Sequence, residues 1–192
     1  NSAIGADITV GGIAGGTIGV TDSAPDGTTI VYGTASDNKS YGNITFSAAD
    51  SATIVAGGIV GSMNGGSASN NYVGGNITTV EKTGTDSDGN PTQLELSFNS
   101  LNLTAGGVVG SMTGTGTISG NYAWGNIELS KNADLFNGDD YAITELNVGG
   151  VVGSVSDTLT FTGNNSLTSI YIVQRAQTHN INAMIGNKNE AS

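Results

Sequence analysis

Short apolar stretches, which either alternate with polar residues or are flanked by glycine, recur along the whole chain. Residues 94–98 and 158–162 alternate with a period of two, and residues 170–173 form a compact apolar run. Such patterns predict β-strands. No segment carries apolar residues at positions i, i+3, i+4 and i+7, the spacing that predicts an amphipathic helix. The hydrophobic pattern therefore predicts an all-β protein.

One six-residue motif occurs four times within this pattern. Residues 10–15, 56–61, 105–110 and 148–153 each contain an apolar residue, two glycines, two further apolar residues and a closing glycine. Residues 182–186 form a degenerate fifth copy. The closing glycines are 46, 49, 43 and 33 residues apart. Internal similarity of this kind predicts a repeat architecture.

A second motif, Asn-Tyr-x-x-Gly-Asn-Ile, follows the first. It is complete at residues 71–77 and 121–127, shortened at 41–44 and degenerate at 165–170. The spacing within a pair of motifs is tight, whereas the spacing between pairs varies. The pair is therefore the repeat unit, and the segments between pairs are insertions that the fold tolerates.

A short strand repeated at a long interval is typical of a solenoid, in which each repeat stacks on the last and buries a shared core. The fold class that we predict is an all-β, single-stranded, right-handed parallel β-helix, or β-solenoid. It would form one elongated domain over residues 1–192, with repeat units at about 10–55, 56–104, 105–147 and 148–192. With roughly 20–25 residues per coil, we expect about eight or nine coils and a rod about 40 Å long.

Equivalent side chains of successive coils are expected to stack on one another about 4.8 Å apart. Ile59, Val108 and Val151 should then lie one above another. Tyr72 and Tyr122 should stack in the same way. A structure that scattered the three aliphatic residues over separate sheets or helices would contradict the whole interpretation.

Asparagine and glycine are expected to shape the corners of each coil. Asn43, Asn76 and Asn126 are predicted to form a ladder at one corner, because asparagine tolerates left-handed backbone and bonds locally. Glycine permits turns and the close approach of backbone layers. The positions that we assign to the structural repeat are Gly57, Gly58, Gly61, Tyr72, Asn76, Gly106, Gly107, Gly110, Tyr122, Asn126, Gly149, Gly150 and Gly153.

These motifs resemble the GLUG motif, which is named for its Gly-Leu-[any]-Gly core. That motif recurs in bacterial surface proteins, including large adhesins and immunoglobulin A peptidases. Ile or Val stands here where the family usually has Leu. The resemblance covers residues 57–77 and 106–127 well, and residues 11–44 and 149–170 in part. It implies a surface-exposed stalk or adhesive segment, and it transfers no catalytic residue.

Charge and composition narrow the function classes further. The chain has 5 Lys and Arg against 16 Asp and Glu, a formal net charge of −11. We therefore expect no nucleic-acid partner, since phosphate binding needs a basic surface. The absence of Cys excludes disulfides and thiolate zinc sites. No apolar run is long enough for this segment to insert into a membrane. Because the chain begins at Asn1 without a signal-like segment, we expect it to be a mature protein or an excised fragment.

The sharpest local signal for a cofactor is an acidic loop. Asp86, Asp88 and Asn90 provide oxygen ligands at alternate positions around a glycine, which resembles the start of a calcium-binding loop. The final position of a twelve-residue loop would be Ser97, where the full motif has Glu. Two interpretations of this loop therefore remain, a calcium site at Asp86, Asp88 and Asn90 or a plain hairpin tip. No other cofactor is expected.

Catalytic constellations are sparse. His179 is the only histidine, and no nucleophile motif accompanies it, so we expect it to be exposed to solvent. Asp139 and Asp140 are the best candidate pair for a polysaccharide-cleaving enzyme, but adjacent residues on a strand point to opposite faces. An Asx-rich turn is the simpler interpretation of that segment.

Alternating threonines at residues 113–117 and 158–162 raise a further possibility, an ice-binding face. Such a face needs the same threonine column in every coil. Thr115 aligns roughly with Gly66 of the preceding copy, so the sequence predicts that no column forms.

The repeats, together with the missing catalytic groups, predict a non-catalytic adhesin or stalk module, extracellular and on the cell surface. It would bind a glycan or a protein on another surface, or its sister chains. The alternative is a self-assembling extracellular filament or surface-layer subunit. A polysaccharide-cleaving β-helix enzyme remains a third hypothesis.

Overall fold

The computed structural model describes residues 8–19, 33–46, 53–79, 83–85, 88, 91–93, 101–129, 143–172 and 176–188. The regular structure in these ranges is β-strand without helix, which confirms the all-β prediction. Their strand pairs are parallel, apart from the antiparallel hairpin of β10 (Thr83–Thr85) and β11 (Pro91–Gln93). The described part of the chain contains no helix able to cross a membrane.

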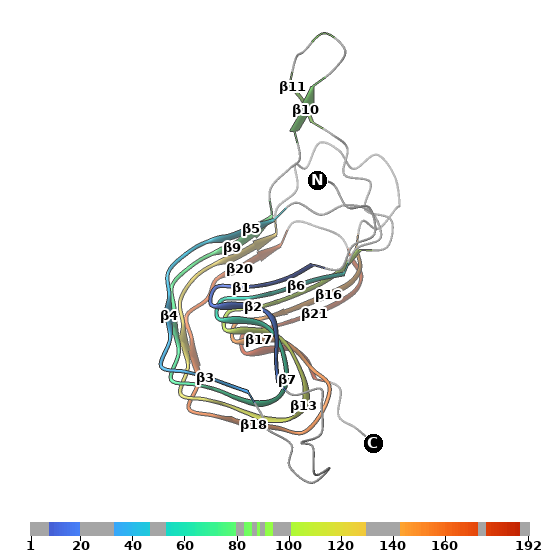
Figure 1. Cartoon of the computed structure of the whole chain (residues 1–192). Helices are drawn as coiled ribbons and strands as arrows, with labels where there is room; N and C mark the ends of the chain where they lie inside the picture. The colour runs from blue at the N-terminus through green and yellow to red at the C-terminus, as the bar shows by residue number, and fades with distance from the viewer. Residues whose placement is uncertain are drawn as a thin grey trace, which may run out of the picture.

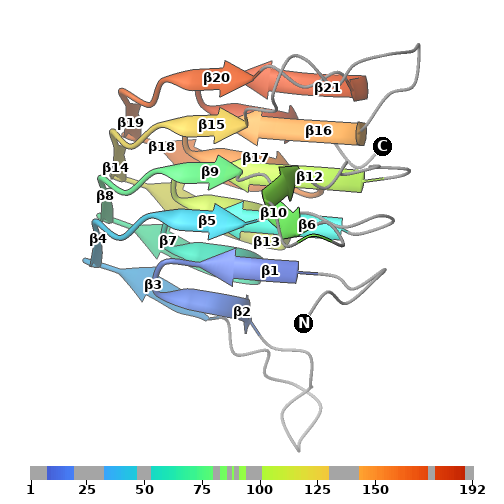
Figure 2. The same cartoon turned by 90° about the horizontal axis from the view of Figure 1, so that it is seen from above.

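The parallel strands form four stacks, which we call sheets A to D in chain order (Figures 1 and 2). Sheet A contains β1 (Ile8–Gly11), β6 (Thr53–Gly57), β12 (Leu101–Gly106), β16 (Ile143–Gly149) and β21 (Ala176–Asn182). Sheet B contains β2 (Ala14–Gly19), β7 (Val60–Ser69), β13 (Val109–Ser119), β17 (Val152–Val155) and β22 (Ile185–Lys188), with β3 (Thr34–Ser36) beside β7 and β18 (Leu159–Thr162) beside β13.

Sheets C and D complete the first four repeats. Sheet C contains the two-residue strands β4 (Lys39–Ser40), β8 (Tyr72–Val73), β14 (Tyr122–Ala123) and β19 (Asn165–Ser166). Sheet D contains β5 (Ile44–Phe46), β9 (Ile77–Thr79), β15 (Ile127–Leu129) and β20 (Ile170–Ile172). The first four repeats thus contribute to each sheet in the same order, and the fifth contributes β21 and β22 within the described residues. Equivalent strands lie above one another (Figure 2).

The pairing register shows how much chain one layer contains. Ile8 pairs with Ile54, Ile54 with Leu103, Leu103 with Leu146 and Leu146 with His179, at offsets of 46, 49, 43 and 33 residues. These offsets equal the spacings of the closing glycines, so one repeat forms one layer. The expected coils of 20–25 residues are therefore wrong, because each layer contains both motifs. Five rungs at about 4.8 Å give a stack about 20 Å high.

Two apolar clusters fill the interior of the layers. The first joins sheets A and D, where Leu103 and Ile127 are among its members. The second joins sheets B and C and contains Ile59, Val108 and Val151, all fully buried. The backbone N–H of Ile59 donates to the carbonyl of Val108 at 2.9 Å, and that of Val108 to Val151 at 2.8 Å. The predicted stacking of these three residues is confirmed.

The double glycine between sheets A and B lets successive layers touch. A Cβ on Gly58 would collide with the carbonyl oxygen of Gly107, and a Cβ on Gly107 with that of Gly150. The fifth layer has Ala183 at this position, and within the described ranges no further layer covers it. The second glycine of the motif is therefore needed wherever another layer lies directly above it.

Candidate functional site

Most of the residues proposed for metal binding or catalysis lie outside the described residues. Asp88 is exposed in the turn between β10 and β11, whereas Asp86 and Asn90 lie outside the described residues, as do Asp139 and Asp140. Among the residues that are described, no group of three His, Cys, Asp or Glu is arranged to hold a metal ion.

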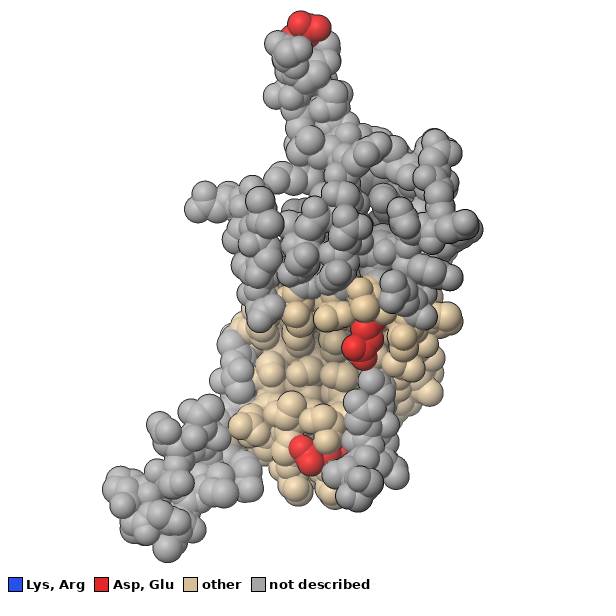
Figure 3. All heavy atoms as spheres, turned by 90° about the vertical axis from the view of Figure 1, so that its right-hand side faces the viewer, with Lys and Arg blue, Asp and Glu red and all other residues tan. Residues whose placement is uncertain are grey.

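His179 lies on β21 and is exposed. It occupies the position that Leu146 fills in the preceding layer. On the face seen in Figure 3, the described Asp and Glu side chains lie at separate places.

Four aromatic side chains from three successive layers gather on the outer side of sheet C. Tyr72 and Tyr122 pair in register, with ring centroids 6.4 Å apart and ring planes at 28°. The ring of Trp124 lies 5.4 Å from that of Tyr122, and the ring of Tyr41 lies 5.8 Å from that of Trp124. We call Tyr41, Tyr72, Tyr122 and Trp124 the aromatic strip.

The aromatic strip is open to solvent. Tyr41 is 60% exposed and Tyr72 45% exposed, while Tyr122 and Trp124 are half-buried. Apolar side chains scattered singly over a surface are ordinary, but contiguous exposed ones mark interaction sites. Because β8 buries Val73 between the outward-facing residues, the rings are held on one side of the sheet.

The orientation of the indole depends on a glycine in the layer before it. Gly74 and Trp124 occupy equivalent positions, since their backbone N–H groups bond to Ser40 and Val73 respectively. A Cβ on Gly74 would come within 2.5–2.7 Å of the indole ring. The missing side chain therefore leaves the space in which the indole lies, between its own layer and Tyr41.

A buried asparagine precedes each of the two stacked tyrosines. The Nδ2 of Asn71 donates to Oδ1 of Asn121 at 2.8 Å and to a backbone carbonyl at 2.9 Å. Asn121 repeats both bonds one layer on, at 2.8 and 2.9 Å. We call this the inner amide ladder, and its members are Asn38, Asn71, Asn121 and Asn164. Its burial was missed from the sequence, although an Asn at four equivalent positions was the available signal.

A second ladder runs along the corner between sheets C and D, at the asparagines that the sequence indicated. The backbone N–H of Asn76 donates to Oδ1 of Asn43 at 2.9 Å, and that of Asn126 to Oδ1 of Asn76 at 2.9 Å. We call Asn43, Asn76 and Asn126 the outer amide ladder. Sheet C, only two residues wide, is therefore bonded by an amide ladder on each side, which fixes the backbone that carries the aromatic strip.

Charge is almost absent around the aromatic strip. The strip lies in two columns of outward-facing residues, one from each layer. The first column is Lys39, Tyr72, Tyr122 and Asn165, and the second is Tyr41, Gly74, Trp124 and Leu167. Lys39 is the one charged residue in them, and its Nζ lies 5.9 Å from the centroid of the Tyr72 ring. A cation over an aromatic face is weakly favourable.

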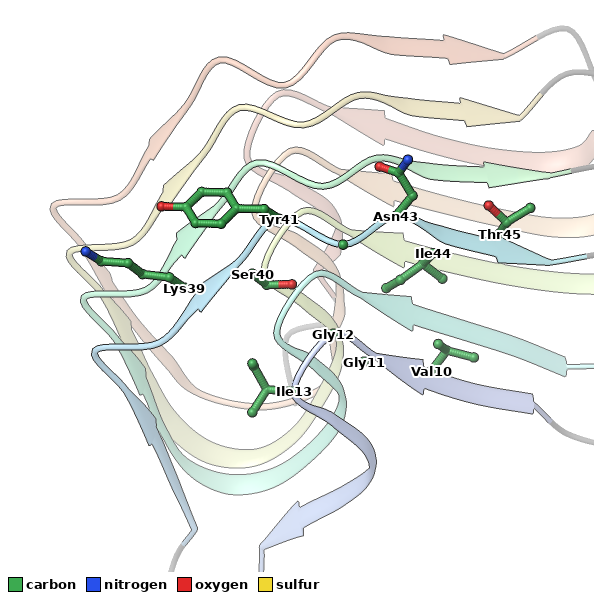
Figure 4. Close-up of a pocket in the computed structure, with 11 residues that line it drawn as sticks. Val10, Gly11, Gly12, Ile13, Lys39, Ser40, Tyr41, Asn43, Ile44 and Thr45 are labelled. Carbon is green, nitrogen blue, oxygen red and sulfur yellow. The ribbon is translucent and has the colours of Figure 1, made fainter.

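A hollow of about 500 Å³ opens at the end of the stack beside the first layer. Residues 10–13 and 39–45 line it. Ser40 and Ile44 point into it, whereas Lys39 and Tyr41 point outward (Figure 4). Within the described residues no layer covers this end, which leaves Ile13 54% exposed.

Sheet B carries a second regular surface beyond its bulge. The inward column includes Ala35, Ala68 and Ile118, and hydroxyl residues flank it on the outer side. The two outer columns are Thr34, Ser67, Thr117 and Thr160, and Ser36, Ser69, Ser119 and Thr162. Ser67 and Ser69 occupy the second layer of these columns, so no column of threonine alone forms, as the sequence predicted. The bulge pairs Gly116 with Gly66, so that Thr117 joins the column while Thr115 lies in the bulge.

Comparison with known proteins does not assign the chain to a family. No protein-family model matches the chain, and no curated protein or solved structure matches it significantly. The resemblance to the GLUG motif therefore stands on the repeated residues alone. Any functional assignment has to come from the stacked layers and from the aromatic strip that they present.

Proposed function

We propose that the chain is a non-catalytic repeat module of an extracellular, cell-surface protein that binds glycan through its aromatic strip. The fold that we assign to it is a right-handed, single-stranded β-solenoid. The support for that fold is the in-register pairing of four complete layers, because each repeat of a solenoid contacts only its neighbours. The GLUG-like motifs support the cell-surface location.

The aromatic strip is the observation that carries the binding function. The C–H faces of a sugar ring are apolar and pack against aromatic rings, while the hydroxyls at its edge remain available for hydrogen bonds. Rigid rings lose little conformational entropy when they bind. Nucleobases also stack on aromatic rings, but a strip with one cation on a chain of net charge −11 disfavours a polyphosphate.

The test is a comparison of two aromatic truncations on an immobilised glycan panel. We expect the unmodified protein to bind at least one class of glycan and Trp124→Ala to bind it at least about tenfold more weakly, a loss of about 1.4 kcal/mol. Tyr171→Ala is the control, because Tyr171 is 60% exposed on β20, outside the strip.

Two results would contradict the proposed function. One is an unmodified protein that binds no glycan on the panel. The other is equal weakening by Trp124→Ala and Tyr171→Ala. Aromatic residues also dominate protein interfaces. If the strip binds a protein instead, the unmodified protein would bind no glycan on the panel but would capture that partner.

End-to-end self-association is a second candidate function, and the exposed first layer favours it. On the outer side of β1 to β5 no described strand is paired, and edge strands with free backbone groups are templates for further pairing. We expect sedimentation to show concentration-dependent association that Ile13→Lys abolishes and that Tyr171→Lys, on the side of the stack, leaves unchanged. A strict monomer at high concentration would contradict this candidate.

A further inference from the structure

The aromatic strip is longer along the stack than across it. Its rings come from the first three layers, and Asn165 and Leu167 continue its two columns into the fourth. Four layers span about 14 Å at about 4.8 Å per rung. The columns themselves are two residues apart along the chain, a distance of about 7 Å. A ligand that covers the strip must therefore lie parallel to the stacking axis.

Each column holds one pair of rings that follow one another along the stack. The centroids are 6.4 Å apart for Tyr72 and Tyr122 in one column and 5.8 Å apart for Tyr41 and Trp124 in the other. The 5.4 Å contact between Tyr122 and Trp124 joins the two columns within one layer. The spacing of each pair is about the length of one sugar residue in an extended chain. Leu167, which is exposed in the fourth layer, continues the column of Trp124. The strip thus offers consecutive apolar contacts rather than a single pocket.

Amide groups accompany the rings at the same period. In the outer amide ladder, Asn43 and Asn126 are exposed along the corner beside the strip. Successive ladder members are one rung apart, because each Oδ1 accepts from the backbone of the next layer. Apolar rings beside a row of amides match a chain whose sugar faces are apolar and whose edges carry hydroxyls.

The charge of the surface selects between classes of glycan. Lys39 is the one cation in the two columns, and it already lies over the ring of Tyr72. The net charge of −11 repels a polyanion. An uncharged polysaccharide would not be repelled in this way, and it needs no cation on the protein to bind.

We infer that the aromatic strip and the outer amide ladder bind a linear, uncharged polysaccharide of extended conformation, with its chain along the stacking axis. This inference rests on the proposed function and names the ligand class of the same site. Trp124, lying in the space left by Gly74, is the central platform, and Gly74 is a positioning residue that keeps the indole in place.

The test uses the whole chain and two matched series of oligosaccharides, a neutral β-linked gluco-oligosaccharide series and an acidic oligogalacturonate series, from dimer to hexamer. Trp124 is the only tryptophan, so its fluorescence reports on the strip directly. We expect a change in its emission with the neutral series, with affinity that rises with length and then levels off. The acidic series is expected to bind at least tenfold more weakly at low salt.

Gly74→Ala separates the position of the ring from the stability of the fold. Its Cβ would meet the indole side chain, which can move, so we expect an unchanged melting temperature, altered tryptophan emission and at least threefold weaker binding of the neutral hexamer. Tyr171→Ala should retain both the emission and the affinity.

Three outcomes would overturn this inference. They are stronger binding of the acidic series, affinity that does not depend on length, and a Gly74→Ala protein with unchanged binding. In each of these cases glycan binding through Trp124 could still hold, and the panel experiment above would show it. If no glycan of either series or of the panel binds, the proposed function fails as well.

Discussion

We expect Gly107→Ala to lower the free energy of unfolding by more than about 3 kcal/mol. The added Cβ overpacks a layer contact made of backbone, and overpacking is one of the few mechanisms with effects this large. For a chain of this size, that corresponds to a loss of about 10 °C in melting temperature. The added Cβ would meet the carbonyl oxygen of Gly150, which is backbone and cannot rotate away. Layers three and four would have to separate, which stretches the 2.8 Å bond from Val108 to Val151. Thermal melting followed by circular dichroism measures the loss.

Gly42→Ala is the matched control for this substitution. Nothing lies within 4 Å of a Cβ built on Gly42, and its backbone does not require glycine. Where alanine fits, it stabilises a chain by about 0.4–1 kcal/mol through the unfolded state. If Gly107→Ala melts as Gly42→Ala does, the layers are not in direct backbone contact at the double glycine. Failure of Gly107→Ala to fold, beside a folded Gly42→Ala, counts as the expected result.

Asn121→Ala is expected to lower the free energy of unfolding by about 3–5 kcal/mol, because several buried polar groups lose their partners at once. The Oδ1 of Asn121 accepts from the backbone and side chain of Asn71, at 3.0 and 2.8 Å. Its Nδ2 donates to Asn164 and to the carbonyl of Ala68. Each buried group left without a partner costs about 1–3 kcal/mol. Urea unfolding followed by circular dichroism measures the change.

Asn165→Ala provides the comparison, since Asn165 is exposed and lies one residue beyond the inner amide ladder. We expect its stability to stay within about 0.5 kcal/mol of the unmodified protein, as for most surface substitutions. Equal stability of the two variants would mean that the inner amide ladder contributes little to the fold. A change in Trp124 emission in Asn121→Ala alone would show that the ladder also positions the strip.

The stacking of repeats could be predicted because identical residues return at equivalent positions. Ile59, Val108 and Val151 recur in the same motif, and the structure places them in one column. The number of layers could not be predicted in the same way. Both motifs resemble a strand followed by a turn, so each was a plausible coil by itself. Only pairing at offsets of 33–49 residues reveals that two motifs and an insertion make one layer.

The aromatic strip illustrates a different limit of sequence reasoning. Tyr72 and Tyr122 belong to the repeat, so their stacking was expected, but Tyr41 and Trp124 have no aromatic equivalent in the layer between them. Their rings meet because Gly74 occupies that position and leaves room for the indole. The hydroxyl columns of sheet B depend in the same way on a bulge, which shifts the register by one residue between Thr113 and Gly116.

The amino-acid sequence by itself determined the all-β character, the repeat and the residues that lie above one another, because local propensity and the recurrence of side chains are properties of the chain alone. The tertiary structure decided how much chain makes a layer, that Asn71 and Asn121 are buried, and which aromatic rings share a surface. These features depend on pairing between strands that are distant in sequence, and the register of that pairing sets which outward side chains meet.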